Sequence, residues 1–304
     1  MKESGDSMIE NTSFKSRMRV VIIYIIVVLL ALLCLLPLWN MICVSFSCSA
    51  AVMGNRVWLY PVRFTVAAYG KIMGDSQFWR SFGISVQRVI ISLMLNMAMI
   101  VLMAYPLSKS KREFHSRNIY MYLLIFAMLF SGGMIPGYLV VKNLGLLNTI
   151  WALTLPGAVP IFSVIMVMNF FVGIPKSLEE AAIIDGASPL QVLVKIFIPC
   201  SKASLATVAL FSIVGSWNDF YSGLIYMTKI RNYPIMTYIQ SINISVEELM
   251  QGGVDSSTLM NITDVSNQSL NAAKIVVAIV PLLLIYPLLQ RYLITGIVMG
   301  AVKE

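Results

Sequence analysis

Long uncharged apolar stretches separated by short polar ones dominate the chain. The first runs from Val20 to Trp39 over 20 residues, which at about 1.5 Å per residue spans about 30 Å, the hydrocarbon thickness of a bilayer. A cleaved signal peptide is the alternative, because small residues follow this stretch. Its apolar core would be only about 7–15 residues long, however. We therefore expect a retained transmembrane helix.

Five similar stretches follow, which predicts an all-α polytopic membrane protein with six transmembrane helices. Gly132, Gly133 and Pro136 should break the third helix near its outer end. A short tail, residues 1–18, precedes a membrane domain of residues 19–304. The expected spans are about 20–43, 83–108, 118–138, 148–172, 203–225 and 272–294.

Composition supports this class of protein. Hydrophobic residues make up 58% of the 304 residues and charged residues only 12%, about half the charged share of a soluble domain. Such hydrophobicity also excludes intrinsic disorder. The net charge of +8 could indicate nucleic-acid binding, but basic residues also gather in the cytoplasmic loops of membrane proteins. We expect a lipid environment and no nucleic-acid partner.

The distribution of basic residues predicts the orientation. The short loop 109–117 is basic, as is the N-terminal tail, and six spans place both on one side. The positive-inside rule makes that side cytoplasmic, so both termini are expected there. Segment 45–81 also carries basic residues and would lie outside, which disagrees, but it is longer and carries less weight. Segment 226–270 is polar and is expected to be an extracytoplasmic loop.

One cytoplasmic segment, residues 175–200, is too polar to span the membrane. Ser177 with Glu180, and Ser188 with Gln191, each fit a capping box, in which side chains at the first turn of a helix satisfy free backbone N–H groups. The segment therefore predicts two short helices.

A turn should separate these two helices. Gly186 is free to take a left-handed conformation after the first helix, and Pro199 should end the second helix before the fifth span. Ala181 and Ala182 leave a low surface that a partner could approach closely. Several apolar residues lack the length to span, so either a partner or the chain's own bundle must cover them. These residues are Ile183, Ile184, Leu190, Val192, Leu193 and Val194.

The same segment carries a spaced motif. Glu180-Ala181-Ala182, then Gly186, then nine residues, then Ile196-Phe197-Ile198-Pro199 resembles the EAA loop of binding-protein-dependent ABC importer permeases. That pattern reads E-A-A-x-x-x-G, nine residues, I-x-L-P, and only Ile198 departs from it, in a mild way.

The resemblance extends over nearly the whole chain and points to the carbohydrate branch, closest to the polysaccharide-type permeases. Glu304 stands where that branch usually ends in glycine, which leaves the packing of the tail open. The similar segments are Ala104–Ser108, Gly132–Pro136, Lys142–Thr149, Trp217-Asn218, Tyr286–Tyr292 and Gly300–Lys303.

The family resemblance implies an importer in a bacterial cytoplasmic membrane. It would contain a second permease, expected to be a different chain, two ATP-binding subunits and an extracytoplasmic sugar-binding protein. ATP and Mg would bind only the ATP-binding subunits. Arg291 and Lys303, in the C-terminal tail, would contact the ATP-binding subunits. The residues implied to couple this chain to the ATP-binding subunit are Glu180, Ala181, Ala182, Asp185, Gly186, Ile196 and Pro199.

Nothing in the sequence predicts catalysis. It contains no G-x-x-x-x-G-K-[ST] phosphate-binding motif, and with His115 as its only histidine we expect neither a catalytic residue nor a metal site. An ion-gradient-driven secondary transporter is the alternative function. That class often has internal repeats and carboxylates within spans, and here we find no clear repeat and hardly any such acids.

Candidate pore residues lie at the outer end of the fifth span. Trp217, Asn218, Asp219 and Tyr221 combine aromatic faces with hydrogen-bonding groups, as a sugar site requires. The alternative is an interfacial aromatic belt with one acid that reaches the membrane surface. Asn96, inside the second span, is expected to make a helix–helix hydrogen bond.

Overall fold

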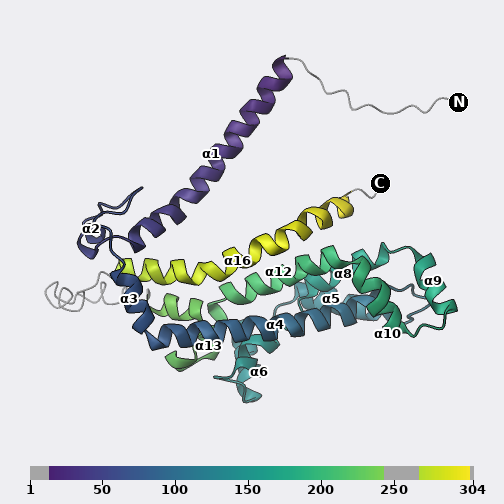
Figure 1. Ribbon diagram of the computed structural model, residues 1–304. Coiled ribbons are helices and arrows are strands. Elements are labelled where there is room, and N and C mark those ends of the chain that lie inside the picture. Colours follow the sequence, from purple (N-terminus) through teal and green to yellow (C-terminus); the bar gives the residue numbers. More distant parts are fainter. Residues whose placement is uncertain (1–13, 243–266, 302–304) are drawn as a thin grey trace. The chain divides into compact units, whose positions relative to one another are not determined.

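The computed structural model describes residues 14–242 and 267–301, which form helices joined by turns and loops (Figure 1). No strand occurs in these two ranges beyond an isolated bridge between Ser47 and Phe64. Among the described residues, one compact unit contains 14–72 with 267–276, and a second contains 73–242 with 277–301.

Three helices in the described ranges are long and apolar enough to cross a membrane, and three bent helix pairs raise the number to as many as six. The long helices are α1 (Phe14–Ser45), α4 (Ser76–Ser108) and α16 (Asn267–Ala301). α4 begins seven residues before the expected start of the second span. Asp75 explains this, because its side chain accepts a hydrogen bond from the Phe78 N–H at 3.0 Å and caps the helix.

The first unit combines α1 with two short helices, α2 (Ser49–Met53) and α3 (Ala67–Gly74). Side chains near the C-terminal end of α1 donate hydrogen bonds to the loop after α2: the Trp39 indole to the Leu59 carbonyl and the Asn40 amide to the Trp58 carbonyl, both at 2.8 Å. Aromatic stacking of Phe46 on Phe64 adds to this contact. In contrast, residues 20–39, most of the expected span, are exposed on every side of α1, as lipid contact requires.

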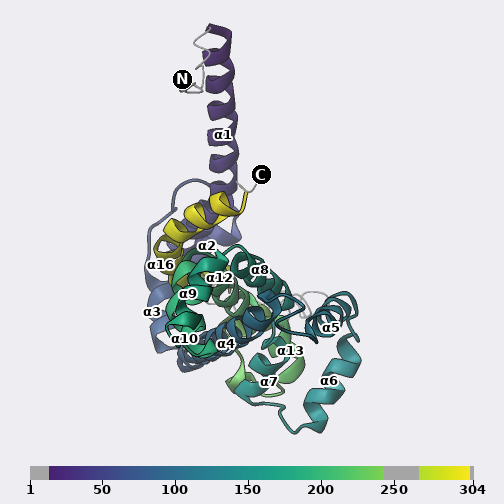
Figure 2. The same ribbon diagram turned by 90° about the vertical axis from the view of Figure 1, so that its right-hand side faces the viewer.

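The second unit is built around α4, which packs against α8 (Ile161–Val172) and α12 (Lys202–Asn218) (Figures 1 and 2). Small and polar residues on the inner face of α4, such as Ser85 and Ser92, are buried there, which lets neighbouring helices approach closely. The apolar core gathers toward the end of α4 near Leu107.

The third stretch turns a sharp corner, as the glycines predicted. α5 (Arg117–Leu129) and α6 (Met134–Asn143) meet at 113° (Figure 2). Gly133 takes a φ of +89° immediately before α6, a conformation that costs glycine little. Pro136 lies in the first turn of α6, where its missing N–H would have no helical partner in any case.

The expected fourth span, 148–172, is not one continuous helix. That stretch contains α7 (Ile150–Thr154), a 3-10 turn η1 (Leu155–Gly157) and then α8. Pro160 precedes α8 and supplies no N–H for the preceding turn, so the helix restarts after it. The fifth stretch is likewise divided, because α12 ends at Asn218 and α13 (Tyr221–Tyr226) follows.

Only part of the polar segment 226–270 is described. After α13 come a 3-10 turn η3 (Ile230–Asn232) and a helical stretch that starts at Ile235. Residues 243–266 lie outside the described ranges. α16 then forms one helix that includes Pro281 and Pro287.

A close helix contact provides a stability prediction. A Cβ at Gly223 in α13 would lie 2.0 Å from Oγ1 of Thr237 and 2.8 Å from its Cβ, so Gly223→Ala should destabilise the domain by about 1–3 kcal/mol. Gly83→Ala is the matched control, because a Cβ there meets nothing within 4 Å. Thermal unfolding in detergent measures both, and equal melting midpoints would contradict the prediction.

Candidate functional site: the EAA loop and a polar cavity

The EAA loop, residues 175–200, forms one end of the second unit (Figure 1). It contains α9 (Lys176–Ile184), a turn, α10 (Pro189–Val192), a π-helical segment (Leu193–Phe197) and α11 (Ile198–Cys200). The predicted two-helix arrangement is therefore present, although its second helix is irregular.

The turn follows the sequence prediction. Gly186 has a φ of +79°, which L-residues with a side chain adopt at a cost. The second capping box is confirmed: the Ser188 N–H donates to the Gln191 side chain at 2.8 Å, and the Gln191 N–H donates to the Ser188 hydroxyl at 3.4 Å. The first predicted capping box is wrong. α9 begins at Lys176, so Ser177 lies inside the first turn instead of before it, and no side chain caps the helix.

Pro199 also differs from expectation, because it does not end the second helix. The chain stays helical to Cys200 and bends by 84° at Ser201, before α12. The preceding π-helical turn replaces the regular i→i−4 hydrogen bonding that a proline would interrupt.

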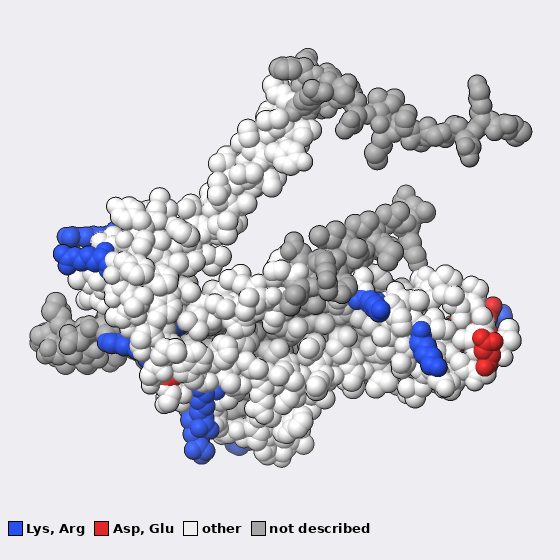
Figure 3. Space-filling model, in the orientation of Figure 1, with Lys and Arg blue, Asp and Glu red and all other residues white. Residues whose placement is uncertain are grey.

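The loop has an inner and an outer face. Val192, Leu193 and Phe197 are buried in the chain's own core. The side chains of Val192 and Leu193 therefore need no partner to cover them. Other apolar side chains remain uncovered, most of all Ile184 at 86% exposed. Acidic side chains gather at the same end of this unit, while long stretches of its surface carry no charge (Figure 3). The exposed large apolar side chains of the loop are Leu178, Ile183, Ile184, Leu190 and Val194.

The motif residues are divided between these two faces. Glu180, Ala181, Asp185 and Gly186 are exposed, as is Pro199. Ala182 and Ile196, in contrast, are partly buried against the core of the bundle. The expectation that both alanines present a low surface to a partner therefore needs correction, because consecutive residues of a helix point in different directions. Ala181 faces outward and Ala182 packs inward.

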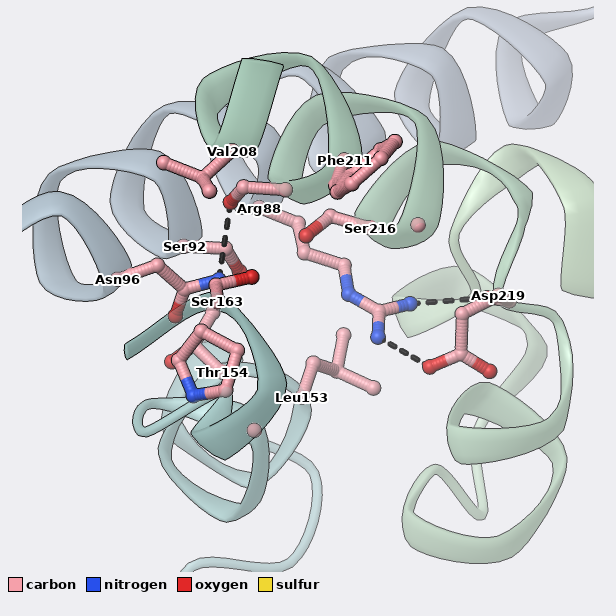
Figure 4. Close-up of a pocket in the computed structure, with 14 residues that line it drawn as sticks. Arg88, Ser92, Asn96, Leu153, Thr154, Ser163, Val208, Phe211, Ser216 and Asp219 are labelled. Atoms are coloured by element: carbon pink, nitrogen blue, oxygen red, sulfur yellow. Dashed lines mark hydrogen bonds and ion pairs between the residues drawn. The ribbon is translucent and has the colours of Figure 1, made fainter. Parts of the chain in front are cut away.

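A polar cavity of about 230 Å³ lies among α4, η1, α8 and α12 (Figure 4). Hydroxyl, amide and charged groups converge on it from helices far apart in the sequence. Its polar lining consists of Arg88, Ser92, Asn96, Thr154, Ser163, Ser212, Ser216 and Asp219.

An ion pair between Arg88 of α4 and Asp219 after α12 closes one side of this cavity (Figure 4). The guanidinium contacts the carboxylate and also donates to the Asp219 backbone carbonyl at 2.9 Å. Arg88 is only 3% exposed, and its Nε finds no acceptor in the part of the chain that the structure describes. Asp219 also accepts hydrogen bonds from Ser222. The pair thus joins the second and fifth stretches.

Asn96 makes the predicted contact between helices, because its amide lies 2.9 Å from the Ser212 hydroxyl of α12. With its amide nitrogen turned the other way, it also reaches the carbonyls of Gly157 at 3.1 Å and Ala158 at 3.2 Å. These carbonyls lie at the break before α8, where proline removes regular helix bonding. Asn96 can therefore both join α4 to α12 and donate hydrogen bonds to backbone carbonyls that lack a helical partner at this break.

The four predicted pore residues do not converge. Asp219 lines the cavity, but Trp217 is only 4% exposed and its indole donates to the Ala278 carbonyl at 3.1 Å. Asn218 is exposed, and the exposed Tyr221 donates to the Met134 sulfur. Helix periodicity is the reason, because consecutive residues point in different directions. The predicted contacts of the C-terminal tail stay a prediction, because the Arg291 side chain and Lys303 lie outside what the structure describes.

Sequence reasoning missed Arg88, which lies within the expected second span, 83–108, but was given no role. A usable signal was present: one arginine and one aspartate of opposite charge at the ends of two apolar stretches. Charges in or near membrane spans tend to pair with one another.

The fold and the loop together define a class: an all-α polytopic membrane protein of the transporter permease type. A model of the family described as "Binding-protein-dependent transport system inner membrane component" matches residues 116–298. The chain belongs to this family of ABC importer permeases.

Its relatives include the polygalacturonan/rhamnogalacturonan transport system permease protein of Bacillus subtilis (strain 168), 39% identical over 95% of this chain and 99% of that protein. The trehalose/maltose transport system permease protein of Thermococcus litoralis is 27% identical over 91% of this chain and 94% of that protein. A crystal structure of a bacterial ABC transporter that imports the acidic polysaccharide alginate contains a similar chain. It has a TM-score of 0.81 and 29% identity over 92% of this chain and 98% of that one.

Proposed function

We propose that this chain forms half of the translocation pore of an ATP-driven importer for an oligosaccharide or polysaccharide fragment. The relatives whose names refer to polysaccharide or oligosaccharide transport support this substrate class. The observation that carries the coupling role is the uncovered apolar surface of the EAA loop, with Ile184 at 86% exposed. Such a surface is typical of a docking site for a partner protein.

The complete transporter would contain two ATP-binding subunits, a second and different permease, and an extracytoplasmic sugar-binding protein. ATP and Mg bind in the partner subunits, and this chain supplies no catalytic group. Both termini and the EAA loop face the cytoplasm, which agrees with the basic loop 109–117. ATP binding closes the partner dimer and moves the EAA loop, and the spans then reorient. A ligand drives such a change only through different affinities for the two states.

Purification from the native membrane in mild detergent, followed by mass spectrometry, tests the proposal. Ile184→Asp should remove the ATP-binding subunit while the second permease stays bound, because the charge is placed on the docking surface only. Ile230→Asp is the matched control, since Ile230 is also exposed, at 59%, but lies in η3 away from the loop. If the unsubstituted chain came out alone, or if Ile184→Asp kept the ATP-binding subunit, the docking role would be refuted.

A further inference from the structure

A partly buried charged cluster attaches α9 to the rest of the second unit. The ammonium group of Lys109, the residue after α4, forms an ion pair with Glu179 of α9. The Lys109 and Glu179 side chains are only 13% and 23% exposed. The Lys109–Glu179 pair thus joins the EAA loop to the end of α4 by a charge contact.

Aromatic rings enclose the same ammonium group. It lies 4.2 Å from the ring centroid of Tyr105, in the last turn of α4, and 4.4 Å from that of Phe197, in the π-helical segment. The two rings meet edge to face at 5.0 Å, and Phe171 of α8 contacts Phe197 at 5.3 Å. A cation between aromatic faces is stabilised further when it is shielded from water. One side chain thus connects α4, α9 and the second half of the loop.

The two neighbouring glutamates of the loop differ in their environment. Glu180 is exposed on the outer face, whereas Glu179 points inward to Lys109. No residue of α9 is fully buried, so apolar packing alone holds this helix weakly. Without the ion pair, α9 would be free to rotate about its own axis when a docked partner moves it.

From these contacts we infer that Lys109 and Glu179 are positioning residues, which fix the orientation of α9 so that movement of a docked partner reaches α4. This inference rests on the proposed function, because it requires a partner that moves the EAA loop. It concerns the inner face of the loop, away from the exposed motif residues that would contact the partner.

The test uses the complete transporter in liposomes, with its binding protein and its transported sugar. Lys109→Gln and Glu179→Gln should each lower sugar-stimulated ATP hydrolysis and uptake about tenfold, since each leaves one partly buried charge unpaired. Lys109→Arg should keep most of the activity, because it retains the charge and stacks on aromatic rings. The exchange Lys109→Glu with Glu179→Lys should recover part of it. Lys111→Gln, at an exposed lysine two residues away, is the matched control.

Three measurements distinguish a positioning role from a loss of docking or a loss of folding. The ATP-binding subunit should still copurify with both glutamine variants, and basal ATP hydrolysis should persist, while the number of sugars imported per ATP falls. Unchanged stimulation in both variants, or complete loss of the ATP-binding subunit, would overturn the inference. Failure of the proposed function looks different, because sugar would then not stimulate ATP hydrolysis even in the unsubstituted transporter.

Discussion

Replacing Gly186 by aspartate should abolish sugar-stimulated ATP hydrolysis while the chain still inserts into the membrane. The φ of +79° at this turn costs a residue with a side chain about 1–2 kcal/mol. The new carboxylate would also stand beside Asp185, at the exposed end that is already acidic (Figure 3). Burying an unpaired charge against a docked partner costs several kcal/mol, and each 1.4 kcal/mol is about tenfold. We therefore expect less than about a tenth of the stimulated rate.

Gly145→Asp is the matched control for this experiment. Gly145 also has a positive φ, +69°, and in neither glycine would a Cβ meet an atom within 4 Å. The backbone strain is thus comparable, but Gly145 lies between α6 and α7, away from the EAA loop. ATP hydrolysis in reconstituted transporter and the amount of chain in the membrane are measured for both variants. Normal stimulation in Gly186→Asp, or equal loss in both, would contradict a coupling role.

Asp219→Asn should be among the most destabilising single changes in the second unit. The asparagine oxygen can still accept the hydrogen bond that Ser222 donates to Asp219 through its N–H, so the change removes mainly the negative charge. Arg88, at 3% exposed, would then be a buried cation without its partner. Arginine does not lose its proton in proteins. We expect a loss on the order of 3 kcal/mol and a melting midpoint in detergent lower by roughly 5 °C or more.

The two members of the Arg88–Asp219 ion pair should differ in how much stability is lost when each is replaced. Arg88→Gln leaves an aspartate that is 29% exposed and still bonded to Ser222, so this change should cost less than Asp219→Asn. The double variant should resemble Arg88→Gln, because it leaves no buried charge. Arg80→Gln is the matched control on the same helix, since Arg80 is exposed and donates to the Arg231 carbonyl. Equal melting midpoints for the two single variants would refute the unequal burial on which this prediction rests.

Local signals in the sequence predicted much of the fold correctly. The corner at Gly133 and the capping box at Ser188 depend on a few neighbouring residues, and so does the positive φ at Gly186. In each case the relevant physics, a missing Cβ or a side chain that satisfies a free N–H, acts within one turn of the chain. The Ser177 capping box did not form, because α9 begins at Lys176, two residues before the start that this box requires.

Residues that act across the bundle were harder to predict. Arg88 and Asp219 are 131 positions apart in the sequence, and Lys109 and Glu179 are 70 apart. The neighbouring residues do not determine which partner each charge takes, because the pairing depends on which helix faces meet. Trp217 illustrates the same limit: its aromatic side chain suited a sugar pore, but the packing of α12 directs it inward to the Ala278 carbonyl.

The sequence by itself determined the class of this protein, because the length of its apolar stretches, its few charges and the spaced EAA motif are properties of the chain alone. It also determined the position of the EAA loop and of its turn. Only the tertiary structure decided which motif residues face outward, since Ala181 and Ala182 differ only in the direction in which α9 presents them. Tertiary packing likewise produced the polar cavity and the Arg88–Asp219 and Lys109–Glu179 ion pairs, because long-range charge pairs form only where separate helices bring their side chains together.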